Sequence, residues 1–253
     1  MSQYRPVSER LTDYKPVELR LPPDVLEKEL KCCQDCGIPF CHAVGCTLAN
    51  VIPEINAAAL AGRWESALAN LQSTSPFPEI TARICPALCE GSCVQGLNGL
   101  PVPCRLVEYE VIERGFAAGW VRPRPPLRCL PYSAAVIGSG PAGLAVAWRL
   151  NQAGLAVTVY ERDARPGGFL RYGIPDFKLA KDILDRRITL LEQEGIKFEC
   201  GVEAGLDISE RLLQRRYDLV VLAVGARRQR DLDLPGRNLA GIHQATDYLS
   251  AQN

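Results

Sequence analysis

The sequence lacks a net charge, a long hydrophobic run and an apolar N-terminal segment. Among its 253 residues, 29 Lys and Arg balance 29 Asp and Glu, which leaves no positive surplus to hold nucleic acid or an anionic membrane. The most apolar stretches are far shorter than the ~20 residues that cross a bilayer. The opening stretch MSQYRPVSERL has no signal-peptide core. We therefore expect a soluble, unsecreted, cytoplasmic protein with no nucleic-acid or membrane partner.

Cysteine, in contrast, is abundant and clustered. Of the 11 cysteines, nine lie between Cys32 and Cys104. In a reducing cytosol such clustering favours metal or cluster ligation over disulfides. The chain after about residue 133 instead alternates apolar strands with amphipathic helices, and VRPRPPLRCLPYS between the two parts is stiff and Pro-rich. We predict a helical domain over 1–120, a linker over 121–133 and an α/β domain over 134–253.

Short helices are expected between and after the cysteines. The stretches 53–62, 63–72 and 105–119 place apolar residues on one face at helical spacing, with Pro53 at a first turn and Gly62 at an end. Their aromatic residues are expected to pack in the core of this domain.

The cysteines form two runs with close, regular spacing. These are Cys33-x2-Cys36-x4-Cys41-x4-Cys46 and Cys85-x3-Cys89-x3-Cys93. Seven thiolates exceed the four ligands of one tetrahedral zinc or of one [4Fe-4S] cluster, whereas two clusters need eight. The eighth ligand would be Cys32, Cys104 or a carboxylate. Structural zinc and unligated buried thiols are the alternatives to iron–sulfur clusters.

A dinucleotide-binding pattern follows the Pro-rich segment. Strand AAVI leads directly into Gly138-x-Gly140-x-x-Gly143, then a helix, and then strand AVTVYE, which ends at Glu161. Such glycines permit a tight turn, a close approach to a pyrophosphate and helix packing on the strand. The helix N-terminus favours phosphate, and Glu161 would accept from ribose hydroxyls and disfavour a 2′-phosphate. This pattern predicts FAD or NAD rather than NADP.

Further alternation predicts a parallel sheet with helices on its faces. A turn at Gly167-Gly168 permits close passage beside a ligand. Helices are expected over 178–194 and 208–216, and strands over 196–200 and 218–226. The turn at Gly225 would lie at the carboxyl ends of the strands, where such sheets bind ligands.

The chain resembles the small (beta) subunit of NADPH-dependent glutamate synthase and related FAD/iron–sulfur oxidoreductases, including the N-terminal half of dihydropyrimidine dehydrogenase. The resemblance rests on CQDCGIPFCH, GRWESAL, FPEITARICPALCEGSCVQG, VIGSGPAGLAVAWRL, VYERDARPGGFLRYGIPDFKL, LAVGARRQRDLDLPG and GIHQATDYL. It implies an α-helical iron–sulfur domain with two [4Fe-4S] clusters, followed by a partial α/β Rossmann-like FAD-binding domain.

The resemblance also assigns residues to each cofactor. The first cluster would be held by Cys33, Cys36, Cys41 and Cys93, and the second by Cys46, Cys85, Cys89 and Glu108. For FAD it supports Gly138, Gly140, Gly143, Glu161, Arg162, Gly168, Tyr172 and Pro175. No side chain of this chain is expected to be a catalytic nucleophile or acid–base group.

Relatives continue into a second Rossmann-type domain that binds NADPH, but no second GxGxxG occurs here. The resemblance therefore implies an NADPH site outside this chain and no NADPH oxidation by this chain alone. It implies electron transfer from NADPH-reduced FAD through the clusters to a large glutamate synthase subunit. Two alternatives remain: a module for another reductase and its redox partner, and a catalytically silent, cofactor-bearing interaction protein.

Overall fold

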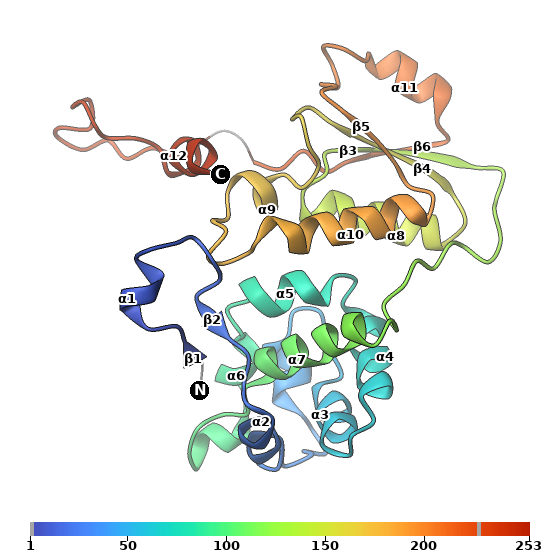
Figure 1. The fold of residues 1–253 in the computed structure, drawn as a ribbon. Coiled ribbons are helices and arrows are strands. Elements are labelled where there is room, and N and C mark those ends of the chain that lie inside the picture. The colour runs from blue at the N-terminus through green and yellow to red at the C-terminus, as the bar shows by residue number, and fades with distance from the viewer. Residues whose placement is uncertain (1–2, 227–228) are drawn as a thin grey trace. The chain divides into compact units, whose positions relative to one another are not determined.

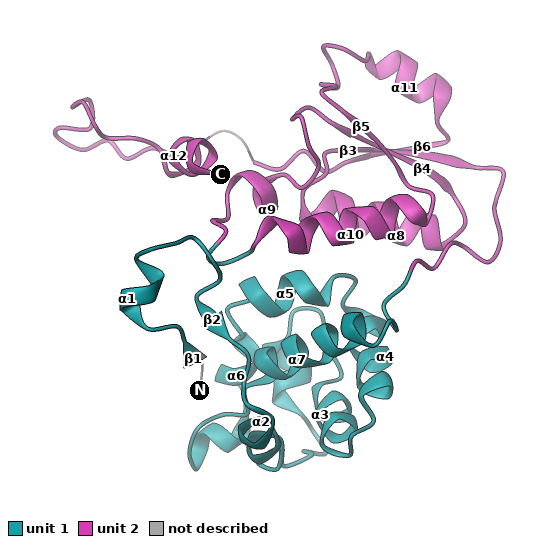
Figure 2. Cartoon of the chain, viewed as in Figure 1, with its two compact units in different colours: residues 1–122, 177–179 teal, residues 123–176, 180–253 magenta. Residues whose placement is uncertain are grey.

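The computed structural model describes residues 3–226 and 229–253, in which the chain forms two compact units (Figure 2). One unit comprises 1–122 with 177–179, and the other comprises 123–176 with 180–253. Residues 227 and 228, within the LAVGARRQR stretch quoted above, lie outside the described residues. The segment predicted as a linker belongs mostly to the second unit, where Leu130 N donates to Gly154 O at 2.8 Å.

The first unit is helical apart from one small antiparallel pair of strands (Figure 1). Its strands are β1 (Gln3–Tyr4) and β2 (Glu18–Leu19). Its α-helices are α1 (Val7–Arg10), α2 (Pro23–Leu30), α3 (Ile52–Leu60), α4 (Trp64–Thr74), α5 (Pro78–Ile84), α6 (Leu88–Gly91) and α7 (Cys104–Ala117). A π-helical turn spans Cys41–Gly45, and a 3-10 turn spans Val94–Leu97.

Helices α2, α3, α4 and α7 bury one apolar face each in a common core. Leu71 of α4 and Val111 of α7 are fully buried there, and Trp64 packs against the same cluster. The predicted core faces of the three longer helices are confirmed. Burial of each large aliphatic side chain contributes about 1.5–3 kcal/mol, so this core fixes α3 and α7 beside the cysteine loops that flank them.

The second unit is a four-stranded parallel sheet with helices on both faces (Figure 1). Its strands are β3 (Ser133–Ile137), β4 (Ala156–Glu161), β5 (Lys197–Cys200) and β6 (Leu219–Leu222), in the order β5-β4-β3-β6. Its helices are α8 (Pro141–Gln152), α9 (Phe169–Tyr172), α10 (Lys181–Gln193), α11 (Glu210–Arg216) and α12 (Ala245–Gln252). The predicted fold class, a helical domain followed by a partial parallel α/β domain, is confirmed.

Some element ends differ from the sequence prediction for local reasons. Strand β6 ends at Leu222 rather than 226, because its partner β3 stops at Ile137 and the chain turns away at Gly138. Helix α11 starts at Glu210 because Ser209 caps it, with Oγ accepting from Leu212 N at 3.3 Å.

Candidate functional site

The two cysteine runs meet in the first unit. Five cysteines line one recess: Cys33, Cys36, Cys41 and Cys93 come from the two runs, and Cys104 lies outside them. Gly45 lies so close to the second run that a Cβ there would be 2.6 Å from Cys89 Cα. The backbone therefore brings residues that are far apart in sequence into direct contact, as ligation of a shared cluster requires.

Several N–H groups point at the cysteine sulfurs. Asn50 N donates to Cys46 Sγ at 3.4 Å, and Ala87 N donates to Cys85 Sγ at 3.4 Å. The side-chain amide of Asn56 donates to Cys33 Sγ at 3.5 Å. Such donors stabilise thiolate charge and tune the reduction potential of iron–sulfur clusters.

Backbone strain is concentrated in the same loops. Asp35, Ala49 and Ala87 have φ of 45°, 50° and 58° and are the non-glycine residues with positive φ in the described chain. Each lies within a few residues of a cysteine of the two runs. A left-handed non-glycine residue costs of order 1–3 kcal/mol, so the surrounding packing must hold these loops in shape.

Glu108 of α7 is a carboxylate placed beside the cysteines. It is only 7% exposed, and burial raises its pKa to about 7. Its Oε1 accepts from Asn50 Nδ2 at 2.8 Å. Cys104, one turn earlier, is also buried in the apolar cluster that contains Cys89, and its pKa is raised by its contact with Cys89 and by burial.

Burial also shifts two thiols of the runs, those of Cys41 and Cys85, toward the neutral form. It raises the pKa of Cys41 to about 11 and raises the pKa of Cys85. Thiols must lose their protons to bind metal, so cluster assembly here would release protons.

Within residues 3–226 and 229–253, no three His, Cys, Asp or Glu side chains converge on a point as ligands of a single metal ion do. A cubane is different, because each of its four irons takes one thiolate at its own corner. The recess with four cysteines from two runs, the N–H donors and the buried Glu108 fit such a group.

The second unit contains a cavity of about 650 Å³ at the carboxyl end of its sheet. This size is typical of small-molecule sites. Its walls come from the loop after β3, the end of β4, the start of α9, the segment after β5 and the end of β6. The predicted residues on the wall are Gly138, Gly140, Glu161, Arg162, Gly168 and Gly225.

The three glycines of the loop have different roles. A Cβ at Gly143 would lie 1.9 Å from Gly138 O, and one at Gly138 would lie 2.5 Å from Ala223 O. These two positions require glycine for backbone packing. Gly140 has nothing within 4 Å of its ideal Cβ, lines the cavity and is the N-cap of α8, where it supplies no capping side chain. The open helix N-terminus and the free space at Gly140 fit a pyrophosphate.

Glu161 is buried at the end of β4 and held by local donors. Its Oε2 accepts from Ser139 N at 2.9 Å and from the Ser139 hydroxyl, and its Oε1 accepts from Asp163 N at 3.0 Å. Ser139 Oγ in turn accepts from Gly167 N at 2.9 Å. The carboxylate is thus fixed at the cavity wall, with acceptor capacity left on its oxygens.

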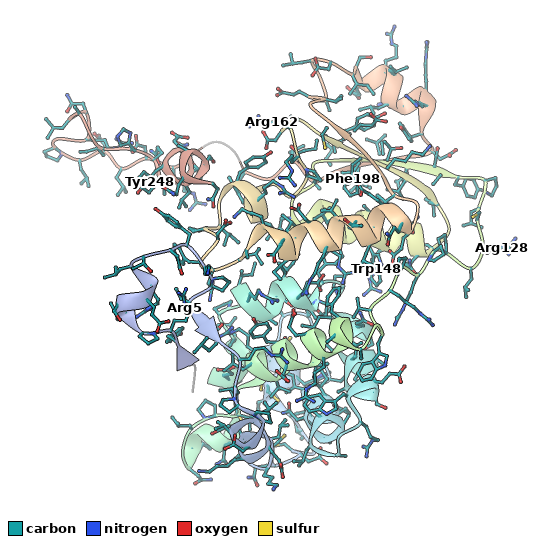
Figure 3. All side chains as sticks on the ribbon, viewed as in Figure 1. Arg5, Arg128, Trp148, Arg162, Phe198 and Tyr248 are labelled. Carbon is teal, nitrogen blue, oxygen red and sulfur yellow. The ribbon has the colours of Figure 1, made fainter. Side chains whose placement is uncertain are left out.

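The other predicted contacts are placed differently. Arg162 borders the cavity (Figure 3). Its Nη1 lies 3.9 Å from Glu203 Oε1, and its Nε lies 3.8 Å from Asp163 Oδ1. Tyr172 and Pro175 are not among the described residues that line the cavity. The Tyr172 hydroxyl instead accepts from Arg165 N at 3.1 Å.

Two polar residues were missed by the sequence interpretation. Ser139, which is fully buried, joins the glycine loop, β4 and the Gly167 turn. Asn50 joins Cys46 to Glu108. Ser139 could have been noticed because it lies inside the glycine motif. For Asn50 the sequence offers only its position four residues after Cys46.

Two family models match the two parts of the chain. Residues 10–120 match the model described as dihydropyrimidine dehydrogenase domain II, 4Fe-4S cluster. Residues 136–174 match the model of the NAD(P)-binding Rossmann-like domain. The two matches place an iron–sulfur region ahead of a dinucleotide-binding region, a pairing that suits electron transfer.

Relatives give a more specific similarity. The glutamate synthase [NADPH] small chain of Mycobacterium tuberculosis is 49% identical over 98% of this chain and 51% of its own. That of Bacillus subtilis is 45% identical over 95% of this chain and 50% of its own. Among solved structures, Mycobacterium tuberculosis FprA in complex with NADPH matches with a TM-score of 0.44 and 32% identity, over 48% of this chain and 28% of that one. Over nearly its whole length the chain is thus similar to about half of a glutamate synthase [NADPH] small chain.

The chain spans about half the length of the curated relatives it matches. Its match to them nevertheless runs across both units rather than one. In the described ranges, no helix has the length and apolarity needed to cross a membrane.

Proposed function

We propose that this chain is the electron-transfer component of a glutamate synthase-type oxidoreductase. In this function, electrons pass between NADPH-reduced FAD and two [4Fe-4S] clusters, and on to a large partner subunit that makes glutamate. The observation that carries the proposal is the meeting of two cysteine runs around one recess, in a chain whose second unit has an open glycine-loop cavity. The names of the close relatives support the glutamate product.

The first cluster would be bound by the four run cysteines that line the recess, Cys33, Cys36, Cys41 and Cys93. The amide of Asn56 supports one of these sulfurs. The second cluster would be bound by Cys46, Cys85, Cys89 and Glu108. Two of these sulfurs already accept backbone N–H bonds, and the buried carboxylate supplies the eighth ligand that seven thiolates leave open. Cys32 and Cys104 are then spare.

FAD would occupy the cavity of the second unit. Its pyrophosphate would lie at Gly140 and the N-terminus of α8, between Gly138 and Gly168, while Gly143 permits the tight packing of the loop. Glu161 and Arg162 border the same space and would face the ribose side. Tyr172 and Pro175, off the described wall, would contact FAD only at its flavin end.

When bound, the flavin would exchange a hydride for single electrons and the clusters would carry those electrons singly. This chain's residues would bind the irons of the clusters, bury the cofactors and exclude water from them. No side chain would act as an acid, base or nucleophile. The NADPH site would lie outside this chain.

The test is an assay of iron, sulfide and flavin on chain purified without oxygen. We expect about eight irons and eight sulfides per chain, a stoichiometric FAD and an electron paramagnetic resonance signal after reduction with dithionite. Colourless protein with all cysteines freely alkylated would contradict the proposal. Binding to a large glutamate synthase subunit separates this function from a module for another reductase. Cofactor content with no electron delivery to any partner would favour the interaction protein.

A further inference from the structure

Asn50 is a buried polar residue in the loop between Cys46 and α3. It is 2% exposed, and its backbone and side chain contact groups from four different parts of the first unit. Its N–H donates to Cys46 Sγ at 3.4 Å, and its carbonyl oxygen accepts from His42 Nδ1 at 2.9 Å. Because a carbonyl only accepts, the His42 ring must carry its proton on Nδ1.

The orientation of the Asn50 amide is fixed by Thr74, the last residue of α4. The Thr74 hydroxyl donates to Asn50 Oδ1 at 2.6 Å. The amide nitrogen is thereby directed to the other side, where it donates to Glu108 Oε1 at 2.8 Å. Both ends of the amide are satisfied in this arrangement, whereas a flipped amide would turn its carbonyl oxygen toward the Glu108 carboxylate and lose that bond.

Glu108 receives one hydrogen bond in this arrangement, on Oε1. Its carboxylate is 7% exposed, and in the described part of the chain no second hydrogen bond accompanies the one from Asn50. The other oxygen, Oε2, keeps acceptor capacity for a ligand. The Glu108 carboxylate lies near Cys85 and Cys89, whose thiols interact electrostatically with it.

We propose that Asn50 is a positioning residue for the second cluster: it holds Oε1 of Glu108 so that Oε2 is left to bind iron, while its backbone N–H holds Sγ of Cys46. This inference rests on the proposed function and adds a residue that sets the geometry of two ligands at once. Asn56, whose amide donates to Cys33 Sγ, occupies the corresponding place for the first cluster. The two buried asparagines therefore act on different clusters.

The experiment uses the whole chain, purified without oxygen, with iron content and the resonance signals of the reduced clusters as readouts. For Asn50→Ala we expect the second cluster to be lost, with iron falling from about eight to about four per chain. Thr74→Val keeps the shape of the side chain but frees the amide to flip. We expect it to keep both clusters at first and to lose the second one roughly 10–100-fold faster in the presence of a chelator, the usual range for such supporting residues.

A reciprocal exchange separates positioning from general support of the fold. Asn50→Asp places a second carboxylate against Glu108, and we expect loss of the second cluster. Adding Glu108→Gln reverses the hydrogen bond, since the Gln amide can donate to the new carboxylate and keep its own carbonyl oxygen for iron. We expect the double variant to regain the second cluster. Asn56→Asp is expected to change only the signal of the first cluster, and Asn70→Asp, in α4, neither signal.

The results distinguish this inference from the proposed function. A parent chain without iron refutes the proposed function. A parent with two clusters refutes the inference if Asn50→Ala and Thr74→Val keep both clusters with unchanged signals and chelation rates. Failure of the reciprocal exchange to restore the cluster, in a variant that unfolds thermally like the parent, also refutes it.

Discussion

The glycine loop offers a prediction in which two neighbouring Gly→Ala substitutions affect different properties, one the stability of the second unit and the other FAD binding. Gly143→Ala would put a methyl group 1.9 Å from Gly138 O, against an ordinary contact of 3.4 Å or more. The backbone of the loop or of α8 must then move to make room. Overpacking of this kind costs about 3 kcal/mol or more, and the higher helix propensity of Ala returns only about 1 kcal/mol. We expect a net loss of about 2 kcal/mol or more in the stability of the second unit.

Gly140→Ala has none of these contacts. No atom lies within 4 Å of the ideal Cβ, and the backbone at φ −63° and ψ −179° is open to Ala. We expect stability within about 0.5 kcal/mol of the parent, because the entropy gained from replacing Gly offsets the weaker N-cap. The methyl group would, however, occupy the space assigned to the pyrophosphate. Loss of one hydrogen bond to a charged group costs about 1.5–3 kcal/mol, which lowers FAD affinity roughly 10–100-fold.

The assay combines thermal unfolding of the flavin-free chain with FAD titration followed by flavin fluorescence. Gly99→Ala is the matched control, because Gly99 lies in the first unit and the nearest atom to its Cβ is 3.9 Å away. Unchanged FAD affinity in Gly140→Ala would refute the placement of the pyrophosphate. Unchanged stability in Gly143→Ala would refute the argument from close backbone approach.

The other predictions address the cluster recess, the helical core and one ion pair. Cys36→Ser should remove the first cluster and about half of the iron, measured by iron assay, whereas Cys129→Ser, at an exposed position of the second unit, should keep all of it. Leu71→Ala should cost about 2–5 kcal/mol in urea unfolding followed by circular dichroism, because Leu71 is fully buried in the first core; a cost below about 1 kcal/mol would contradict that burial. The hydrogen bonds from Arg5 lower the pKa of Asp13 to about 2, so this pair contributes stability above the ordinary pKa of 3.8 that is lost as the pH falls toward 2 (Figure 3). Arg5→Gln should return the Asp13 pKa toward 3.8 in an NMR titration, and an unchanged pKa would show that the pair is not formed in solution.

Features that depend on short-range pattern could be predicted from sequence. Apolar periodicity located the helices of the first unit and the alternation of strands and helices in the second, because the buried face of each element repeats at its own period. The glycine loop could also be predicted, because close backbone packing requires glycine at Gly138 and Gly143 and both belong to one short motif. Ends of elements were less accessible, because β6 ends where its partner β3 ends and not where its own apolar residues stop.

The cysteine spacing illustrates what pattern can and cannot supply. Spacing counted seven thiolates and left an eighth ligand open, but it could not choose among Cys32, Cys104 and a carboxylate, because that choice depends on which side chain the folded α7 presents to the two runs. In the structure Glu108 accepts a hydrogen bond from the side-chain amide of Asn50. Cys104 lies in the same apolar cluster as Cys89.

Asn50 and Ser139 show why residues that hold a site in place cannot be predicted from sequence motifs. Each is a small polar residue whose function depends on bonds to partners distant in sequence: Glu108 is 58 positions from Asn50, and Gly167 is 28 positions from Ser139. Neither residue type is rare enough to stand out, and their hydrogen bonds exist only after the helices and strands have packed. Because a buried polar group needs a hydrogen-bond partner, the partners of these two residues identify them in the folded structure. In both units the bonds lead to a carboxylate beside the predicted cofactor, which is the arrangement expected where a fold fixes acidic side chains before a ligand binds.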